Sequence, residues 1–203
     1  MKLKTTKPLI LASASPRRKE LLSLLNVPFE VKTMEIDERA MAAYSPEELV
    51  CNIAMEKGIY VSEEYPDAIV ISADTMVFID EEPLGKPENA KMAREYLRKL
   101  SGRTHTVITG VALFVDDLCS VLFEKTKVTF HPLSEEWIDA YVASGDCFNK
   151  AGGYGIQTVG ALMVEHINGD YNNVVGLPIA KLYHEMRNMG VIEFMEAGSR
   201  YDH

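Results

Sequence analysis

The sequence predicts an α/β fold built on a mixed β-sheet. Apolar runs typical of buried strands, at residues 9–12 and 68–73, alternate along the chain with helical patterns. Two long β patterns, residues 104–115 and 118–131, are separated by an acidic turn and predict an antiparallel hairpin. Interleaved strands and helices with at least one hairpin are typical of an α/β protein whose sheet is mixed.

Start signals mark three helices in the first half of the chain. Ser15-Pro16 combines an N-cap with proline at the first helical position, and leucines then recur on one face as far as Leu25. Residues 45–48, Ser-Pro-Glu-Glu, form a capping box ahead of a second helix. Residues 89–100 form a third helical pattern, and a short strand is expected at residues 29–31.

The second half of the chain continues this alternation. We expect a helix at residues 135–143, a short strand at residues 161–167, and a last helix at residues 178–189 that is closed by Gly190. Residues 150–155 include three glycines. This segment is therefore expected to be a loop with unusual backbone angles.

The 203 residues are expected to form a single domain, 1–203. No repeat, low-complexity segment, or linker rich in Pro, Gly or Ser divides the chain. With 47% hydrophobic and 25% charged residues, the composition is that of a soluble globular protein. Only the polar tail, residues 193–203, is expected to fray.

We expect neither a membrane segment nor a secretion signal. No apolar run approaches the ~20 residues of a membrane span, and the apolar stretch after the basic N-terminus is too short for a signal peptide. The three cysteines are far apart and form no Cys-x-x-Cys pair, which indicates free buried thiols in a reducing compartment. The cytoplasm is therefore the expected location, with no membrane partner.

The net charge of −9 limits the classes of ligand. A non-specific nucleic-acid binder is normally basic, so this balance argues against nucleic acid as a partner. A small phosphorylated ligand is compatible with it, because a local basic cluster can lie in an acidic protein. Carboxylates can also recruit a divalent cation that accompanies the anion.

Residues 11–18, Leu-Ala-Ser-Ala-Ser-Pro-Arg-Arg, are the most informative run. They place small hydroxyl residues and two arginines where a strand passes into a helix. The free N–H groups and the dipole of a helix N-terminus favour an anion, and arginine suits phosphate oxygens in two-point contacts. These residues alone are equally compatible with an ordinary capped helix that carries two solvated arginines.

Asp74 is the sharpest single candidate for chemistry. We expect the strand at 68–73 to end at Asp74-Thr75, with its continuation through residues 76–79 as the alternative, and α/β sheets usually place their ligands at the carboxyl ends of strands. A carboxylate beside six largely apolar residues also requires a partner or a function. The alternative is a turn or helix cap with Thr75 as its partner.

Other polar residues complete a possible site. Asp37 and Glu38 lie in an acidic loop, Lys86 lies between Gly85 and Pro87, Lys57 is expected near the end of its helix, and Gln157 follows the glycine-rich loop. Each signal is weak alone. Together, cations that hold phosphates and carboxylates that hold a metal and activate water are suited to phosphoryl or nucleotidyl transfer to water. The chain contains neither a Walker motif nor Gly-x-Gly-x-x-Gly, which argues against P-loop and dinucleotide-binding proteins.

The sequence resembles the Maf nucleotide pyrophosphatases in several blocks that occur in the same order and spacing. The resemblance covers about residues 8–189. The matching blocks are LASASPRRKELL (11–22), IDE (36–38), SADT (72–75), GKP (85–87), LSGRTHTVITGVAL (100–113), KAGGYGIQ (150–157) and GDYNNVVGLP (169–178).

This resemblance implies an elongated, twisted mixed sheet flanked by helices, with a cleft between two lobes. It implies a nucleoside triphosphate diphosphatase that uses a divalent metal, Mg²⁺ or Mn²⁺, and a family whose members often form homodimers. Asp74 matches the proton acceptor. Arg17, Thr75 and Gln157 match positions that distinguish the dTTP/UTP branch from the sister branch that acts on 7-methyl-GTP. The remaining pocket positions are matched by Ser13, Arg18, Glu38, Lys57 and Lys86.

On this basis we expect water to attack the α-phosphorus of dTTP or UTP, with Asp74 as the base and Glu38 and Asp74 holding the metal. The chain departs from the family pattern at Gly58, where alanine is usual, and at Thr158, where glycine is usual. Two alternatives are a broader house-cleaning pyrophosphatase for modified nucleotides and a nucleotide-binding regulator of cell division.

Overall fold

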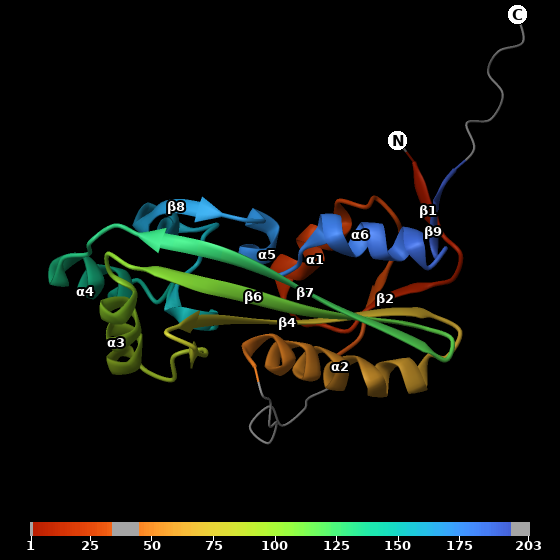
Figure 1. Ribbon diagram of the computed structural model, residues 1–203, viewed down its shortest axis with the longest axis horizontal. Helices are drawn as coiled ribbons and strands as arrows, with labels where there is room; N and C mark the ends of the chain where they lie inside the picture. Colours follow the sequence, from red (N-terminus) through yellow and green to blue (C-terminus); the bar gives the residue numbers. More distant parts are fainter. Residues whose placement is uncertain (1, 34–44, 196–203) are drawn as a thin grey trace, which may run out of the picture.

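Three long antiparallel strands form the axis of the molecule. The computed structural model describes residues 2–33 and 45–195. Strand β4 (Ile69–Ile79) pairs with β6 (Thr104–Val115), which pairs in turn with β7 (Leu118–Phe130), and all three run along the long axis in Figure 1. Nearly every residue of β4 and β6 is buried, as expected for strands that are covered on both faces.

Short strands complete the sheet, whose order is β3-β2-β4-β6-β7-β8 with β5 also on β4. β2 (Leu9–Leu11) is parallel to both β3 (Glu30–Val31) and β4. β5 (Glu82–Leu84) and β8 (Val164–Asn168) are antiparallel to their neighbours. The sheet is therefore mixed, which confirms the predicted α/β class.

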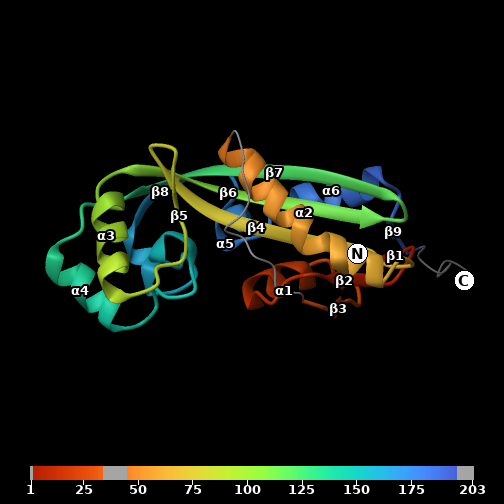
Figure 2. The ribbon, with the colours of Figure 1, turned by 90° about the horizontal axis from the view of Figure 1, so that it is seen from below.

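Helices flank both faces of this sheet. Figures 1 and 2 show α2 on one face, α1, α5 and α6 on the opposite face, and α3 and α4 at one end. Their bounds are α1 Pro16–Ser23, α2 Pro46–Glu64, α3 Ala90–Leu100, α4 Glu135–Ala143, α5 Tyr171–Val175 and α6 Ile179–Asn188.

Side-chain N-caps are present at the first three helices, and those at Ser15 and Ser45 were expected. Ser15 and Ser45 each accept a hydrogen bond from the backbone N–H three residues later, and the amide of Asn89 does the same. Two of these helices also have proline in their first turn, at Pro16 and Pro46. The local signals that start these helices therefore operate as predicted.

Two large hydrophobic cores lie at opposite ends of the long strands. One contains Ile69, Ile71 and Leu113 with residues of α1 and α6, and the other contains Ile79 and Val107 with residues of α3 and α4. Because β4 and β6 contribute to both, the two halves share continuous strands. These shared strands therefore fix the geometry of any site that lies between the two halves.

Several predicted boundaries are wrong. β4 does not end at Asp74-Thr75 but follows the alternative left open by the sequence and continues to Ile79, because its pairing with β6 runs unbroken from Ile69 to Phe78. The strand expected at 161–167 begins only at Val164, after a 3-10 helix, Val159–Met163. The glycine-rich loop includes a 3-10 turn, Ala151–Gly153, with the expected positive φ at Gly152 and Gly153.

Other elements were missed. β1 (Leu3–Thr5) pairs with β9 (Ile192–Phe194), so the first residues of the tail expected to fray lie in a strand, while 196–203 fall outside the described residues. The three cysteines are free, but Cys119 is exposed rather than buried, because it lies near the turn between β6 and β7. None of the helices within 2–33 and 45–195 is long and apolar enough to cross a membrane.

Candidate active site

A cavity of about 870 Å³ opens along one edge of β4. One edge of β4 is fully paired with β6. On the other, β2 pairs with Ile69 to Ile71, and β5 pairs with Val77 to Ile79. Between these pairings, no strand of the described chain covers residues 72–76, and this bare stretch carries Asp74 and Thr75. The polar residues lie where the sheet edge is open, in the middle of a strand.

Alternation along β4 sends Asp74 and Thr75 to opposite faces. Asp74 faces α2, where Lys57 Nζ donates to its Oδ1 at 2.6 Å. The two side chains are only 17% (Lys57) and 10% (Asp74) exposed. Lys57 lies in the middle of α2, which continues to Glu64, so the expectation that it lies near a helix end is wrong. Its position is set by this pair and not by the helix dipole.

Close contact between α2 and the sheet makes this pair possible. Gly110 on β6 is directly opposite Asp74 in the strand register. A Cβ at Gly110 would lie 2.5 Å from the carbonyl oxygen of Val50, so only glycine allows the helix this close. Ser72 Oγ also donates to the carbonyl of Ala54 at 2.6 Å. The α2 backbone is therefore fixed where Lys57 reaches Asp74.

Thr75 faces α1 and α5 and takes part in a chain of hydrogen bonds. Arg18 Nη2 donates to Thr75 Oγ1 at 3.0 Å, and Thr75 Oγ1 lies 2.9 Å from Thr109 Oγ1. Thr109 uses its single proton on the carbonyl of Asn173 at 3.0 Å, so Thr75 donates to Thr109. Thr109 and Asn173 are fully buried, and sequence reasoning missed both. Their only sequence signal is that they lie within the matching blocks.

Arg18 is bound to the protein on three sides. In addition to Thr75, its guanidinium donates to Ser13 Oγ at 3.1 Å and to the carbonyl of Gly176 at 2.9 Å. It thus joins the start of α1 to β4 and to the end of α5. We expected Arg18 to supply general phosphate-binding charge. Its hydrogen bonds also fix the Ser13 and Thr75 side chains.

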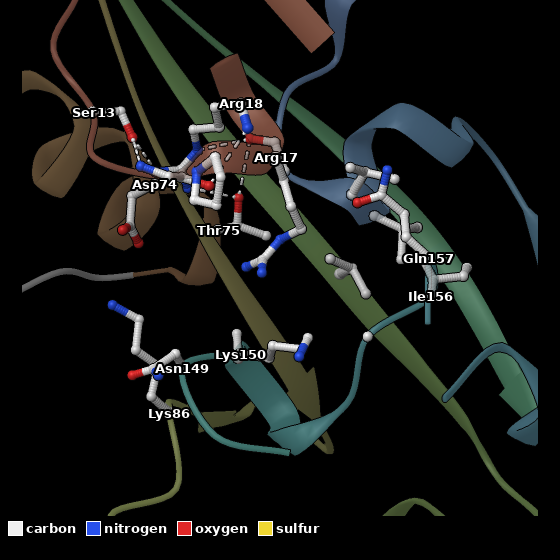
Figure 3. A pocket seen from close by; sticks show the side chains of 18 of the residues that line it. Ser13, Arg17, Arg18, Asp74, Thr75, Lys86, Asn149, Lys150, Ile156 and Gln157 are labelled. Carbon is white, nitrogen blue, oxygen red and sulfur yellow. Dashed lines mark hydrogen bonds between the residues drawn. The ribbon is translucent and has the colours of Figure 1, made fainter. Parts of the chain in front are cut away.

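Arg17 and Lys86 extend into the cavity from opposite sides. In Figure 3 the Arg17 side chain reaches from α1 into the central space, while Lys86 lies across it beside Asn149 and Lys150. Neither Arg17 nor Lys86 forms an ion pair with any residue in the described ranges. The loop that carries Lys86 is held because Gly152 N donates to the carbonyl of Gly85 at 3.0 Å.

Gln157 and Ile156 form a further wall of the cavity. Gln157 is exposed, so its amide is accessible to a ligand, whereas Ile156 is buried. Among the described residues, all the predicted site residues line this one cavity: Ser13, Arg17, Arg18, Lys57, Asp74, Thr75, Lys86 and Gln157. Glu38 and Asp37 lie outside the described residues.

Sequence reasoning also missed an aromatic layer beneath the cavity. Tyr154 lines the cavity, and its hydroxyl lies 2.8 Å from His105 Nε2. The His105 ring packs edge-on against Tyr154 and Phe130. Burial lowers the pKa of His105 to about 4 and raises that of Tyr154. Both rings are therefore neutral at pH 7, and His105 supports Tyr154 from outside the cavity lining.

The donor chemistry at Asp74 suits a hard divalent cation. Mg²⁺ is commonly held by one or two carboxylates together with phosphate oxygens of a substrate. Asp74 supplies one such carboxylate at the cavity wall. No group of three or more His, Cys, Asp or Glu side chains in residues 2–33 and 45–195 could hold a metal ion unaided. The residues thus fit a metal that arrives with a phosphorylated ligand.

Fold and cavity together define an α/β protein whose cleft is lined by arginines and lysines around one buried carboxylate, with an amide on the opposite wall. Residues 8–189 match the Maf-like protein family. The chain belongs to this family.

Curated relatives agree along most of the chain. A protein of Bacillus cytotoxicus named dTTP/UTP pyrophosphatase is 51% identical over 181 residues, which cover 89% of this chain and 95% of the relative. A protein of the same name from Bacillus cereus is 49% identical over 185 residues, 91% of each chain. Another of that name, from Bacillus anthracis, is 49% identical over 183 residues, which cover 90% of this chain and 96% of the relative.

Solved structures agree in fold. The Ham1 protein of Staphylococcus aureus matches with a TM-score of 0.51 and 14% identity, over 88% of this chain and all of that chain. A HAM1 protein of Coxiella burnetii matches with a TM-score of 0.53 and 14% identity, over 90% of this chain and all of that chain. At this identity the likeness concerns the arrangement of strands and helices.

Proposed function

We propose that this chain is a nucleoside triphosphate pyrophosphatase that hydrolyses dTTP and UTP to the monophosphate and pyrophosphate. The observation that carries this proposal is the meeting of Arg17, Thr75 and Gln157 in one cavity with Asp74. These segments are far apart in sequence. The names of the Bacillus relatives support the same substrates.

The chemistry follows from the positions of the charged groups. Water attacks the α-phosphorus, the bond from that phosphorus to the α–β bridging oxygen breaks, and pyrophosphate departs with that oxygen. The proton lost by water passes to Asp74. Lys57 keeps the Asp74 carboxylate in one orientation through its 2.6 Å hydrogen bond. Arg17 and Lys86 balance the triphosphate charge from the two sides of the cavity, as expected for electrostatic stabilisation of phosphoryl transfer.

We propose that Asp74 and Glu38 hold Mg²⁺ or Mn²⁺. When bound, such an ion neutralises charge on the phosphate oxygens and lowers the pKa of coordinated water.

We place the enzyme in the cytoplasm, since three free thiols suit a reducing compartment.

Gln157 is proposed to read the base. Its amide can donate to O4 and accept from N3–H of a thymine or uracil ring, and its exposure on the cavity wall leaves it accessible. A polar group that the bound base buries and leaves unpaired costs about 1–3 kcal/mol, enough for useful discrimination. Replacing Gln157 with Glu should depress dTTP and UTP hydrolysis selectively, whereas equal loss over all nucleotides would show that Gln157 is structural.

The decisive test is a pyrophosphate-release assay on a nucleotide panel. The panel contains dTTP, UTP, dCTP, the purine triphosphates, 7-methyl-GTP and modified uridine triphosphates, each with Mg²⁺, with Mn²⁺ and with EDTA. We expect metal-dependent release that is fastest with dTTP and UTP. Fastest release with modified nucleotides would favour the broader house-cleaning enzyme. Tight binding without release would favour a regulatory nucleotide-binding protein.

A further inference from the structure

One carboxylate, that of Asp146, receives hydrogen bonds from both ends of the loop that carries Gln157. At the start of the loop, Lys150 Nζ donates to Asp146 Oδ1 at 2.9 Å and to the Asp146 carbonyl at 2.5 Å. At its end, Thr158 Oγ1 donates to Asp146 Oδ2 at 2.6 Å. Tyr141 of α4 donates to the same Oδ2 at 2.7 Å.

These contacts close the loop into a compact unit. Gly155 N donates to Tyr141 Oη at 3.3 Å, so the middle of the loop is tied to the same cluster. A Cβ at Gly155 would lie 2.6 Å from Lys150 Cε and 2.7 Å from Thr158 Oγ1, which shows how closely the two ends approach. The residues enclosed include cavity-lining Tyr154 and Gln157.

The Asp146 carboxylate is partly shielded, with 19% of its side chain exposed. Burial by itself raises its pKa, but the hydrogen bonds from Thr158, Tyr141 and Lys150 outweigh burial and leave the pKa below its ordinary value. The group is therefore ionised at neutral pH and accepts charge-assisted hydrogen bonds, which are shorter and stronger than neutral ones.

Thr158 directly follows Gln157, and its hydroxyl is one of three side-chain donors to the Asp146 carboxylate. Without this hydroxyl, Asp146 would keep only Lys150 and Tyr141. Thr158 Oγ1 also lies 3.0 Å from the carbonyl of Gly155, but the carboxylate at 2.6 Å is the stronger acceptor for its single proton. Thr158 therefore tethers the chain to Asp146 immediately after Gln157.

We propose that Asp146 is a positioning residue that fixes Gln157 for base recognition through the tether from Thr158. The inference rests on the proposed function for its substrate and on the hydrogen bonds above for its geometry. Thr158 lines the cavity and Asp146 does not, so hydrogen exchange without nucleotide separates the tether from a direct contact of Thr158 with the nucleotide. Together, Thr158 and Asp146 lower the number of conformations available to the base-reading amide, so that less conformational entropy is lost when the base binds.

The test compares Thr158→Val, which keeps the shape but loses the hydroxyl, with Thr158→Ser, which keeps the hydroxyl. Thr158→Val spares the Lys150–Asp146 ion pair, so the fold is retained. Thr104→Val is the matched control, because Thr104 shares a 2.8 Å hydrogen bond with Thr129 on the exposed sheet, outside the cavity. Steady-state kinetics with dTTP, UTP and dCTP are combined with amide hydrogen exchange over residues 150–158 without nucleotide.

We expect Thr158→Val to raise KM for dTTP and UTP about three- to tenfold, on the scale of one lost hydrogen bond, with kcat within about twofold. The preference over dCTP should shrink, and exchange within residues 150–158 should accelerate severalfold. Thr158→Ser should restore both, and Thr104→Val should change neither. Unchanged exchange in Thr158→Val would overturn the tether, and a fall in kcat alone for all three nucleotides would overturn the positioning role.

The exchange measurement is independent of the substrate. If the unmodified protein failed to hydrolyse dTTP and UTP, the proposed function would be wrong while the exchange of residues 150–158 would still decide whether Thr158 holds the loop. Asp146→Asn provides a second variant, because an amide is a weaker acceptor for the three donors. It should accelerate exchange more than Thr158→Val does, and a smaller effect would contradict the assignment of Asp146 as the anchor.

Discussion

Asp74 meets two requirements of a proton acceptor, because its carboxylate is both accessible from the cavity and held in place. The residue as a whole is 7% exposed, yet its side chain lines the cavity and receives the Lys57 hydrogen bond. Asp74→Asn keeps an oxygen that can accept from Lys57 but loses the ability to take a proton. We expect kcat to fall by ~10²–10⁴, the usual contribution of a general base. Binding of a non-hydrolysable dTTP analogue, measured by calorimetry without metal, should change far less.

Asp117→Asn is the control for this variant, since Asp117 is exposed in the turn between β6 and β7. Its kcat should equal that of the unmodified enzyme. Near-native pyrophosphate release by Asp74→Asn would contradict the role of Asp74 as the base.

His105 predicts a dependence of stability on pH. Burial lowers its pKa to about 4, whereas in the unfolded chain it titrates near 6.5. Between these values the unfolded state binds more protons, so the free energy of unfolding decreases as the pH falls. The stabilisation is complete above about pH 6.5 and lost below about pH 4, and amounts to roughly 3 kcal/mol for this shift.

Urea denaturation of the unmodified protein and of His105→Gln at several pH values between 4 and 7 measures this contribution. Glutamine does not titrate but can still bond Tyr154. The variant should lose less stability on acidification than the unmodified protein. Parallel pH profiles would show that His105 makes no such contribution.

Residue types in the site were predictable from the sequence, but their partners were not. Hydroxyls and arginines at a helix start, and a carboxylate beside a buried strand, indicate phosphate chemistry from local pattern alone. The Lys57–Asp74 and Arg18–Thr75 hydrogen bonds join segments 17 and 57 residues apart. Contacts at such separation depend on how α1 and α2 lie on the sheet, and no local pattern encodes that.

At the scale of elements, the contact between α2 and the sheet is set by small residues. Gly58 is buried on α2, and a Cβ there would overlap the Phe114 ring and lie 2.5 Å from Ser72 Oγ. Ser72 is itself held by its hydrogen bond to Ala54. Glycine at this position therefore leaves room for the large Phe114 side chain.

Gly58→Ala should destabilise the protein. Alanine gains about 1 kcal/mol of helix propensity, but overpacking against Phe114 costs about 1–3 kcal/mol. The net loss should appear as a lower urea midpoint with an unchanged m-value. In the Phe114→Leu background the same substitution should be neutral or stabilising. Higher stability of Gly58→Ala in the native background would contradict this account of the interface.

Long elements with strong periodicity or a capping residue were predicted well, and short ones were not. The hairpin of β6 and β7 and the helices α3 and α4 lie within one or two residues of expectation. The continuation of β4 through two polar residues was left open by the sequence, since it depends on pairing with β6, which overrides the local polar signal. The three-residue strands β1 and β9 and the five-residue α5 are too short for any periodicity to show.

At the scale of the whole molecule, the cavity lies between two cores that share β4 and β6. Arg17 extends from the half that contains α1, and Lys86 follows β5 in the other half. A triphosphate that contacts both therefore bridges the two halves. A ligand that binds only the folded state stabilises it by mass action, by about 2.7 kcal/mol at one hundred times its Kd.

For a chain of this size, that stabilisation corresponds to a rise in Tm of roughly 5–10 °C. We expect this rise with a non-hydrolysable dTTP analogue, followed by calorimetry at fixed ligand concentration. Arg17→Gln and Lys86→Gln should each reduce it by several degrees, because each removes one side of the phosphate contact. Lys91→Gln, an exposed lysine on α3 outside the cavity, should leave it unchanged. If Lys86→Gln left the full rise in Tm, the nucleotide would be held by the α1 half alone, and the bridging of the two halves would be wrong.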